Sequence, residues 1–175
     1  MKKICTILVL LLVLFASQAG FGEKNAKDMF YLQSEIQTIL SGLSDNLNRF
    51  EHLQKLLEST GKENKSYDEH KNIWLSTILA IQAISSICEY EYDLLTLFLD
   101  LKEHRRVHYL DVRIKSLETS AQQMAIMTDQ IRINHRLMPP DLAELHLYEK
   151  LIKNIDSSID LLKSGKNLIL QLKKK

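Results

Sequence analysis

The chain has 175 residues, with 23 Lys and Arg against 22 Asp and Glu, and 45% of its residues are hydrophobic. This length is sufficient for one domain with a sizeable core. The balanced charge argues against nucleic acid as a partner, because nucleic-acid binding needs a basic surface or stripe.

The N-terminus has the layout of a secretory signal peptide. A short basic head precedes the uncharged run ICTILVLLLVLFA, and the small-x-small sequence Ser17-Gln18-Ala19 follows it. We expect residues 1–19 to be the signal peptide, with cleavage after Ala19 or Gly22, and the protein to be periplasmic or secreted. An uncleaved anchor is the alternative, but the run is shorter than the roughly 20 apolar residues that span a membrane. No stable membrane anchor is therefore expected after cleavage.

Cleavage would change both charge and cysteine content. Removing Lys2 and Lys3 leaves 21 basic residues (23 minus 2) against 22 acidic ones, a net charge of −1. Cys88 would be the one remaining cysteine, which excludes an intramolecular disulfide. Small extracellular proteins usually rely on disulfides, so this pattern favours a bacterial periplasm over animal secretion.

Glycine and proline are scarce after the signal region, and neither occurs between Gly61 and Pro139. Such a chain is predicted to be almost entirely helical. We expect one helical-bundle domain over residues 25–175, with helices at about 25–59, 66–102, 106–137 and 141–172. Gly165 is expected to kink or fray the last helix.

Apolar residues recur at steps of three and four in each predicted helix, which is the pattern of helices packed side by side at a shallow angle. In the first helix the expected core positions are Ile36, Leu40, Leu43, Leu47, Phe50 and Leu57. In the second they are Trp74, Ile78, Ile81, Cys88, Tyr92, Leu95 and Leu99, with Ile73, Ile84, Ile87, Leu94 and Leu97 widening the stripe. In the third and fourth they are Val107, Leu110, Ile114, Leu117, Ala121, Met124 and Ile131, and Leu145, Tyr148, Ile152, Ile155, Ile159, Leu162 and Ile169. Polar residues interrupt these stripes at Gln54, Ser85, Thr128, His135 and Lys166. These polar residues either set the register of packing, face a partner, or lie at an end of the bundle.

After Leu99 the apolar stripe of the second helix continues one position later than its spacing predicts. The shift falls within the charged run over residues 102–106. We therefore expect a turn there. Short connections between helices of similar length predict an all-α, up-down-up-down antiparallel four-helix bundle. The alternative is a three-helix arrangement with one very long central helix.

Asp100, His104, His108 and Asp111 are the candidate metal ligands. On one continuous helix they would share a face, and imidazole with carboxylate suits a transition metal. The expected turn would destroy this alignment, and two arginines between the histidines would repel a cation. A solvated, charge-mixed turn is therefore the preferred interpretation, and a periplasmic metal-binding bundle is the alternative.

Haem is the other cofactor considered. No Cys-x-x-Cys-His sequence is present, which excludes the usual covalent attachment. Noncovalent haem in the bundle would draw on Met124, Met127, Met138 and His135, near the stripe of the third helix. Methionine in such a stripe more often fills gaps in the core. No cofactor is therefore expected.

The run Glu89-Tyr90-Glu91-Tyr92-Asp93 could collect a cation, but a solvated helix face with Tyr92 turned inward explains it better. Cys88 is expected to be a small core residue and not a nucleophile. The chain has no glycine-rich phosphate loop, nucleophile elbow or His-Glu-x-x-His sequence. We therefore expect a non-catalytic, exported protein that acts by protein–protein interaction or self-association.

Overall fold

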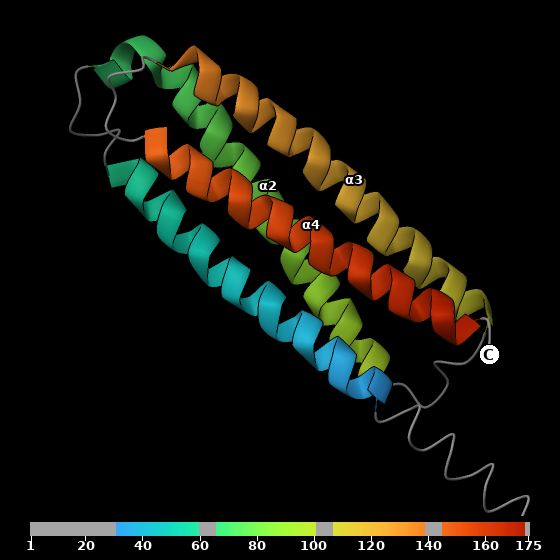
Figure 1. Ribbon diagram of the computed structural model, residues 1–175. Helices are drawn as coiled ribbons and strands as arrows, with labels where there is room; N and C mark the ends of the chain where they lie inside the picture. The colour runs from blue at the N-terminus through green and yellow to red at the C-terminus, as the bar shows by residue number, and fades with distance from the viewer. Residues whose placement is uncertain (1–30, 60–65, 101–106, 139–144, 174–175) are drawn as a thin grey trace, which may run out of the picture. The chain divides into compact units, whose positions relative to one another are not determined.

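The structure is a computed structural model that describes residues 31–59, 66–100, 107–138 and 145–173. These residues form a first helix over 31–59, α2 (Ser66–Asp100), α3 (Val107–Leu137) and α4 (Leu145–Lys173), and they contain no strand (Figure 1). The expected signal peptide and the expected turn at residues 102–106 lie outside the described residues.

The chain divides into two contact units, Met1–Glu35 and Ile36–Lys175. In the first unit, residues 31–35 are helical. The second unit contains the rest of the first helix and all of α2, α3 and α4. These helices form the bundle.

Contacts between side chains give the direction of each helix. Glu91 of α2 binds Arg113 of α3, and Thr77 of α2 binds Asn134 of α3. Residue numbers therefore increase along α2 in the direction in which they decrease along α3. The first helix and α4 are related in the same way. Asn46 binds Ser158, and Gly42, one turn earlier, lies against Leu161. Both pairs are therefore antiparallel.

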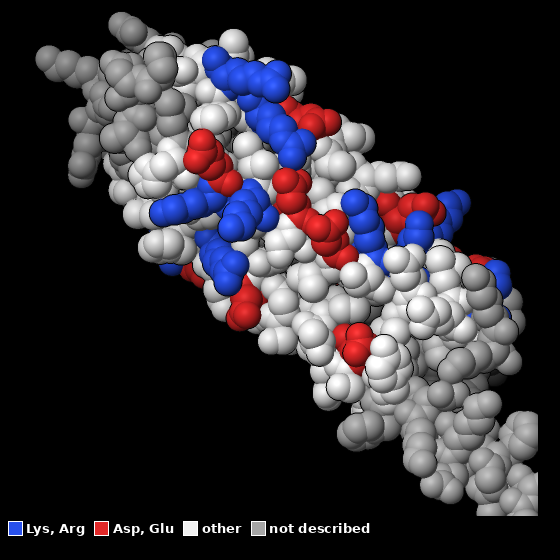
Figure 2. Space-filling view, viewed as in Figure 1, with Lys and Arg blue, Asp and Glu red and all other residues white. Residues whose placement is uncertain are grey.

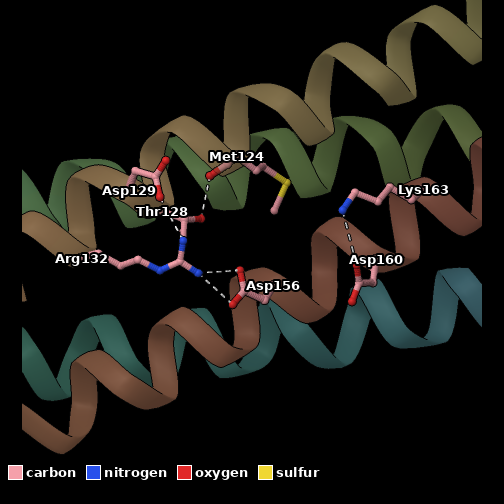
Figure 3. Close-up of polar contacts among 7 residues, drawn as sticks. All are labelled: Met124, Thr128, Asp129, Arg132, Asp156, Asp160 and Lys163. Carbon is pink, nitrogen blue, oxygen red and sulfur yellow. Dashed lines mark hydrogen bonds and ion pairs between the residues drawn. The ribbon is translucent and has the colours of Figure 1, made fainter.

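Helices α3 and α4 also run antiparallel. Arg132 Nη2 donates to Asp156 Oδ2 (3.1 Å), while Lys166 Nζ donates to Glu118 Oε1 (2.9 Å). Figure 3 shows Arg132 extending from α3 between Asp129 of its own helix and Asp156 of α4. Each helix thus runs opposite to its neighbour, which confirms the up-down-up-down four-helix bundle. The alternative with one long central helix is wrong, because α2 and α3 lie side by side.

Helix α2 shows how the core is built. It departs from helical geometry at His70 (φ −113°, ψ 16°). Beyond that point, residues no more than 2% exposed recur at steps of three and four, namely Trp74, Thr77, Ile81, Ile84, Cys88, Glu91, Leu95 and Phe98. The heptad spacing was correctly predicted, and Cys88 is in the core as expected. Ile78, Tyr92 and Leu99 are only half-buried, because Thr77, Glu91 and Phe98, one position earlier, take the core positions.

In each of the other helices most of the expected core residues are buried, and one of them, Leu47, Ile114 or Ile152, is only half-buried. Each places a polar residue in the core next to an apolar residue that had been expected there. Asn46 is buried beside Leu47, Arg113 beside Ile114, and Asn154 two positions after Ile152. The polar interruption at Thr128 is in the core as expected, whereas Gln54, Ser85, His135 and Lys166 are half-buried. Hydrogen bonds across the bundle make these polar core positions possible.

Gly165 neither kinks nor frays α4, which continues to Lys173. The glycine is buried, and a Cβ atom added there would lie 3.7 Å from side-chain carbons of Ile39 and Leu117. A Cβ atom would therefore fit at this position, and the packing between helices does not require glycine there. The expectation of a break at this position was wrong.

Candidate functional site

The four candidate metal ligands do not form a site in the described part of the chain. His104 lies outside that part, and Asp100 is the last residue of α2. The carboxylate of Asp111 accepts a hydrogen bond from Lys173 Nζ of α4, so an ion pair between helices already engages it. Across the described residues, no group of three or more His, Cys, Asp or Glu is placed to hold a metal. The metal site stays a prediction.

The side chains considered for haem are divided along α3. The ring of His135 stacks on Tyr148 with centroids 5.5 Å apart, whereas Met124 is fully buried in the core. His135 is eleven positions after Met124 in the helix, which corresponds to about 16 Å along the axis. These two side chains therefore cannot bind the same iron.

The strongest polar site in the core joins α2 and α3. Arg113 Nη2 donates to Glu91 Oε2 (2.8 Å), and the hydroxyls of Ser116 and Ser120 both donate to Glu91 Oε1 (2.7 Å each). The side chains of Glu91 and Arg113 are 0% and 2% exposed. The three donors and the neutralising charge compensate for the removal of the carboxylate from water. This cluster holds a specific register between α2 and α3.

A second polar group lies between α2, α3 and α4. Asn134 Nδ2 donates to Thr77 Oγ1 (3.0 Å), and the same hydroxyl shares a hydrogen bond with the hydroxyl of Tyr148 (3.3 Å). Burial raises the pKa of Tyr148, while its bond to Thr77 acts in the opposite direction. Trp74 packs against Tyr148, with ring centroids 6.1 Å apart. This arrangement is structural, since the polar atoms satisfy each other.

A groove of about 500 Å³ lies outside the Glu91 cluster, between α2 and α3. Its lining comes from both helices and is Ser86, Ile87, Tyr90, Val112, Lys115, Ser116, Thr119, Ser120 and Gln123. Ser116 and Ser120 thus belong to both features, with their hydroxyls bonded to Glu91. The groove is therefore shaped by a rigid, hydrogen-bonded floor.

The groove is the centre of a longer uncharged surface. On α3, positions at steps of three and four carry no charge, namely Val112, Ser116, Thr119, Gln123, Ile126, Gln130, Ile133 and Leu137. On α2, the corresponding outward positions are Leu79, Ala83, Ser86, Ile87, Tyr90, Leu94 and Leu97. We call these residues together the α2–α3 face.

Several large apolar side chains on the α2–α3 face are exposed to solvent. Leu79 is 63% exposed, Tyr90 56%, Leu97 53% and Ile126 70%. Within the described residues, His70–Leu99 is the one helical stretch that is long and apolar enough to cross a membrane by length and composition alone, and only 28% of its apolar window is buried. The apolar character of α2 therefore exceeds what the bundle core requires.

Charges lie only at the rims of this face. Lys115 is at the α3 rim, and Glu89 and Asp93 are at the α2 rim. The three residues lie at the same height along the bundle, because Arg113 and Ser116 donate to Glu91 and so bring these parts of the two helices together. None of these three forms an ion pair with another residue that the structure describes. Sequence reasoning placed Glu89 and Asp93 on an outward edge but missed the face itself, because it assigned Ile87, Leu94 and Leu97 to a widened core stripe.

Comparison of the chain with known protein families, with curated proteins and with solved structures found no match.

Proposed function

We propose that this protein acts by non-catalytic protein–protein interaction, and that the partner bound at the α2–α3 face is a second copy of the chain. The observation that carries the proposal is the uncharged stripe of α3, which repeats every seven residues from Val112 to Ile133 with Ile126 70% exposed. A heptad stripe of this kind is what one helix presents to another.

The size of the face is adequate for a stable interface. Helices α2 and α3 contain 35 and 31 residues, respectively. A length of about 45 Å and a width of about 20 Å for two adjacent helices give about 900 Å². A standard interface buries about 800 Å² on each partner.

The rim charges favour a second copy over an unrelated partner. A two-fold axis along the groove places α2 of one protomer opposite α3 of the other, at the same level. Lys115 of each protomer then faces Glu89 and Asp93 of its partner, which gives two sets of opposite charges. The uncharged centre brings no like charges together when two identical faces meet. Self-association requires this absence of repulsion.

Native mass spectrometry and sedimentation of the purified protein test this proposal. We expect a dimer whose fraction rises with concentration. Ile126→Glu should shift the protein to monomer, because it would bury a charge in the interface without a partner. Ser164→Glu, which adds the same charge on the exposed side of α4, is the matched control and should leave the dimer intact.

A charge exchange tests the orientation of the two copies. Lys115→Glu should weaken the dimer, since three acidic residues would then meet at each rim. Combining it with Glu89→Lys and Asp93→Lys should restore association. A monomer at every concentration, or equal dimerisation of Ile126→Glu, would contradict the proposal. A mass excess equal to a metal ion or haem would instead favour the cofactor-binding alternative.

We also propose that the protein is exported. The support is the sequence of residues 1–19, with its basic head, apolar run and small-x-small site. Expression of the full chain in a bacterium, followed by mass measurement of the periplasmic fraction, should give a product that begins at Gly20 or Glu23. An uncleaved product in the membrane fraction would contradict this proposal.

A further inference from the structure

A second groove, of about 560 Å³, lies between the first helix and α4. It is lined by Asn48, Arg49, His52, Leu53, Lys150, Lys153, Asn154 and Ser157. Its volume is within the range of about 300–1,000 Å³ that small-molecule sites occupy. Because α2 and α4 are diagonal in the bundle, this groove and the α2–α3 face are on opposite sides, so a dimer would leave the groove open.

The groove has a concentrated positive charge. Arg49, Lys150 and Lys153 contribute three cations, and no residue in the lining is acidic. Figure 2 shows Lys and Arg side chains gathered where α4 lies beside the first helix. None of the three cations is in an ion pair with a described residue. The site is therefore suited to an anion.

The nearby acidic residues do not neutralise this charge. Glu51 on the first helix is engaged by Lys55, which lowers the pKa of that carboxyl. Asp156 on α4 is engaged by Arg132 of α3 (3.1 Å). Asp45 and Glu149, each one helical turn before a groove cation, form no ion pair with Arg49 or Lys153. The groove cations are therefore available to a ligand.

The lining of the groove also includes Asn154, whose buried amide oxygen lacks a hydrogen-bond partner among the described residues. Asn154 is 5% exposed, and its Nδ2 donates to the backbone oxygen of Asn46 (3.0 Å). That bond fixes the orientation of the amide, since the reverse orientation would place two oxygens together. The Oδ1 atom has no hydrogen-bond partner among the described residues. A buried carbonyl oxygen of this kind favours a ligand that brings a donor.

Ser157 adds a donor at the same place. Its hydroxyl oxygen accepts from Asn46 Nδ2 (3.3 Å), so its hydrogen is free to point at a ligand. The groove thus combines cations and a hydroxyl donor, which suit an anionic oxygen, with an acceptor that suits a ligand hydroxyl. We propose that it binds the phosphate ester of a small polyol, such as glycerol phosphate, with the phosphate on Lys150, Lys153 and Arg49 and a hydroxyl on Asn154.

Calorimetric titration of the full-length protein with three probes tests this site. Glycerol phosphate should bind at least about tenfold more tightly than inorganic phosphate, and glycerol alone should not bind at about 1 mM. Equal binding of the two phosphates, or no binding of either, would overturn the proposal. Vesicles containing phosphatidylglycerol, compared with phosphatidylcholine vesicles, distinguish a lipid headgroup from a free ligand as the source of the same chemistry.

A double variant, Lys150→Gln with Lys153→Gln, should reduce the affinity for glycerol phosphate by at least about tenfold. Its matched control is Lys71→Gln with Lys163→Gln, which removes the same charge at exposed positions outside both the groove and the α2–α3 face. Equal weakening by both would mean general electrostatic attraction and would overturn the site. Ser157→Ala should weaken binding without loss of fold, because Ser157 is exposed. Native mass spectrometry of the groove variant should still show the dimer, which keeps this test separate from that of the proposed function.

Discussion

Glu91 and Arg113 form an ion pair inside the bundle, with Arg113 Nη2 2.8 Å from Glu91 Oε2 and both side chains almost fully buried. Ser116 and Ser120 complete the environment of the carboxylate. Two further nitrogens of Arg113, Nε and Nη1, have no hydrogen-bond partner in the described part of the chain. Glu91 therefore provides most of the electrostatic stabilisation that offsets the burial of the Arg113 charge.

Removing one member of this pair should destabilise the protein strongly. Glu91→Ala leaves a buried cation without its partner, and we expect the free energy of unfolding to fall by about 3–5 kcal/mol. Urea denaturation followed by circular dichroism measures this loss. Replacing both residues by leucine should recover much of the stability, because no unpaired charge remains.

The control for that prediction is an ion pair at the surface. Glu118→Ala removes the exposed partner of Lys166 and should cost less than about 1 kcal/mol. If Glu91→Ala costs no more than Glu118→Ala, the buried pair is not an important determinant of stability.

The hydroxyl of Tyr148 should contribute a measurable hydrogen bond. Tyr148→Phe removes the bond to Thr77 Oγ1 and is expected to cost about 1 kcal/mol. A double-mutant cycle with Thr77→Val should give a coupling energy of about 0.5 kcal/mol or more. Strictly additive losses would show that this contact carries no energy of its own.

The two glycines in the bundle should respond differently to alanine. At Gly165 a Cβ atom would meet ordinary contacts of 3.7 Å, so Gly165→Ala should stabilise the protein by about 1 kcal/mol through helix propensity. At Gly42 the Cβ atom would lie 2.8 Å from Leu161 Cδ1, so that leucine must move. Gly42→Ala should be neutral or destabilising by about 1 kcal/mol. Thermal denaturation of the two variants gives the comparison, and a larger gain at Gly42 would contradict it.

The buried thiol of Cys88 should make stability depend on alkaline pH. Burial raises the pKa of Cys88 from 9.0 to about 12, whereas a hydrogen bond with Ser158 lowers it. The unfolded state therefore loses this proton first. The contribution is complete below pH 9 and is lost as the pH rises toward 12.

The test compares two proteins that both carry Cys5→Ser, one with Cys88 and one with Cys88→Ala. Between pH 9 and pH 10, the free energy of unfolding should fall by about 1 kcal/mol more in the protein with Cys88. Urea denaturation at each pH measures this difference. Native Cys88 should also react with a thiol reagent far more slowly than the unfolded chain. Parallel pH profiles for the two proteins would contradict the shifted pKa.

Sequence reasoning correctly predicted the helices and the bundle for a simple reason. Apolar residues at steps of three and four report a helix with one buried side, and short connections require antiparallel neighbours. Most apolar core residues, among them Phe50, Ile81, Cys88, Met124 and Leu162, were also assigned correctly. These features depend on local periodicity and on the length of the chain between breaks.

The exceptions are positions where a polar residue is buried beside an apolar or aromatic residue that had been expected in the core. Leu47, Ile78 and Tyr92 are apolar or aromatic and were expected inside, yet Asn46, Thr77 and Glu91 are the more deeply buried neighbours. Each of these neighbours fits a helical spacing of three and four equally well. The apolar pattern alone therefore does not show which residue of each pair is buried. The choice depends on partners such as Arg113 and Ser158, which are distant in sequence.

Both candidate binding surfaces follow from that choice. With the core stripe of α2 set by Thr77 and Glu91, Leu79, Tyr90 and Leu97 face outward beside α3 and form the α2–α3 face. Arg49 and Lys153 share a groove because the first helix and α4 are antiparallel neighbours. The sequence by itself determined the number, type and direction of the helices, because local periodicity encodes them. Only the tertiary structure decided that polar residues such as Asn46, Thr77 and Glu91 also occupy the core, because their hydrogen-bond partners are distant in sequence.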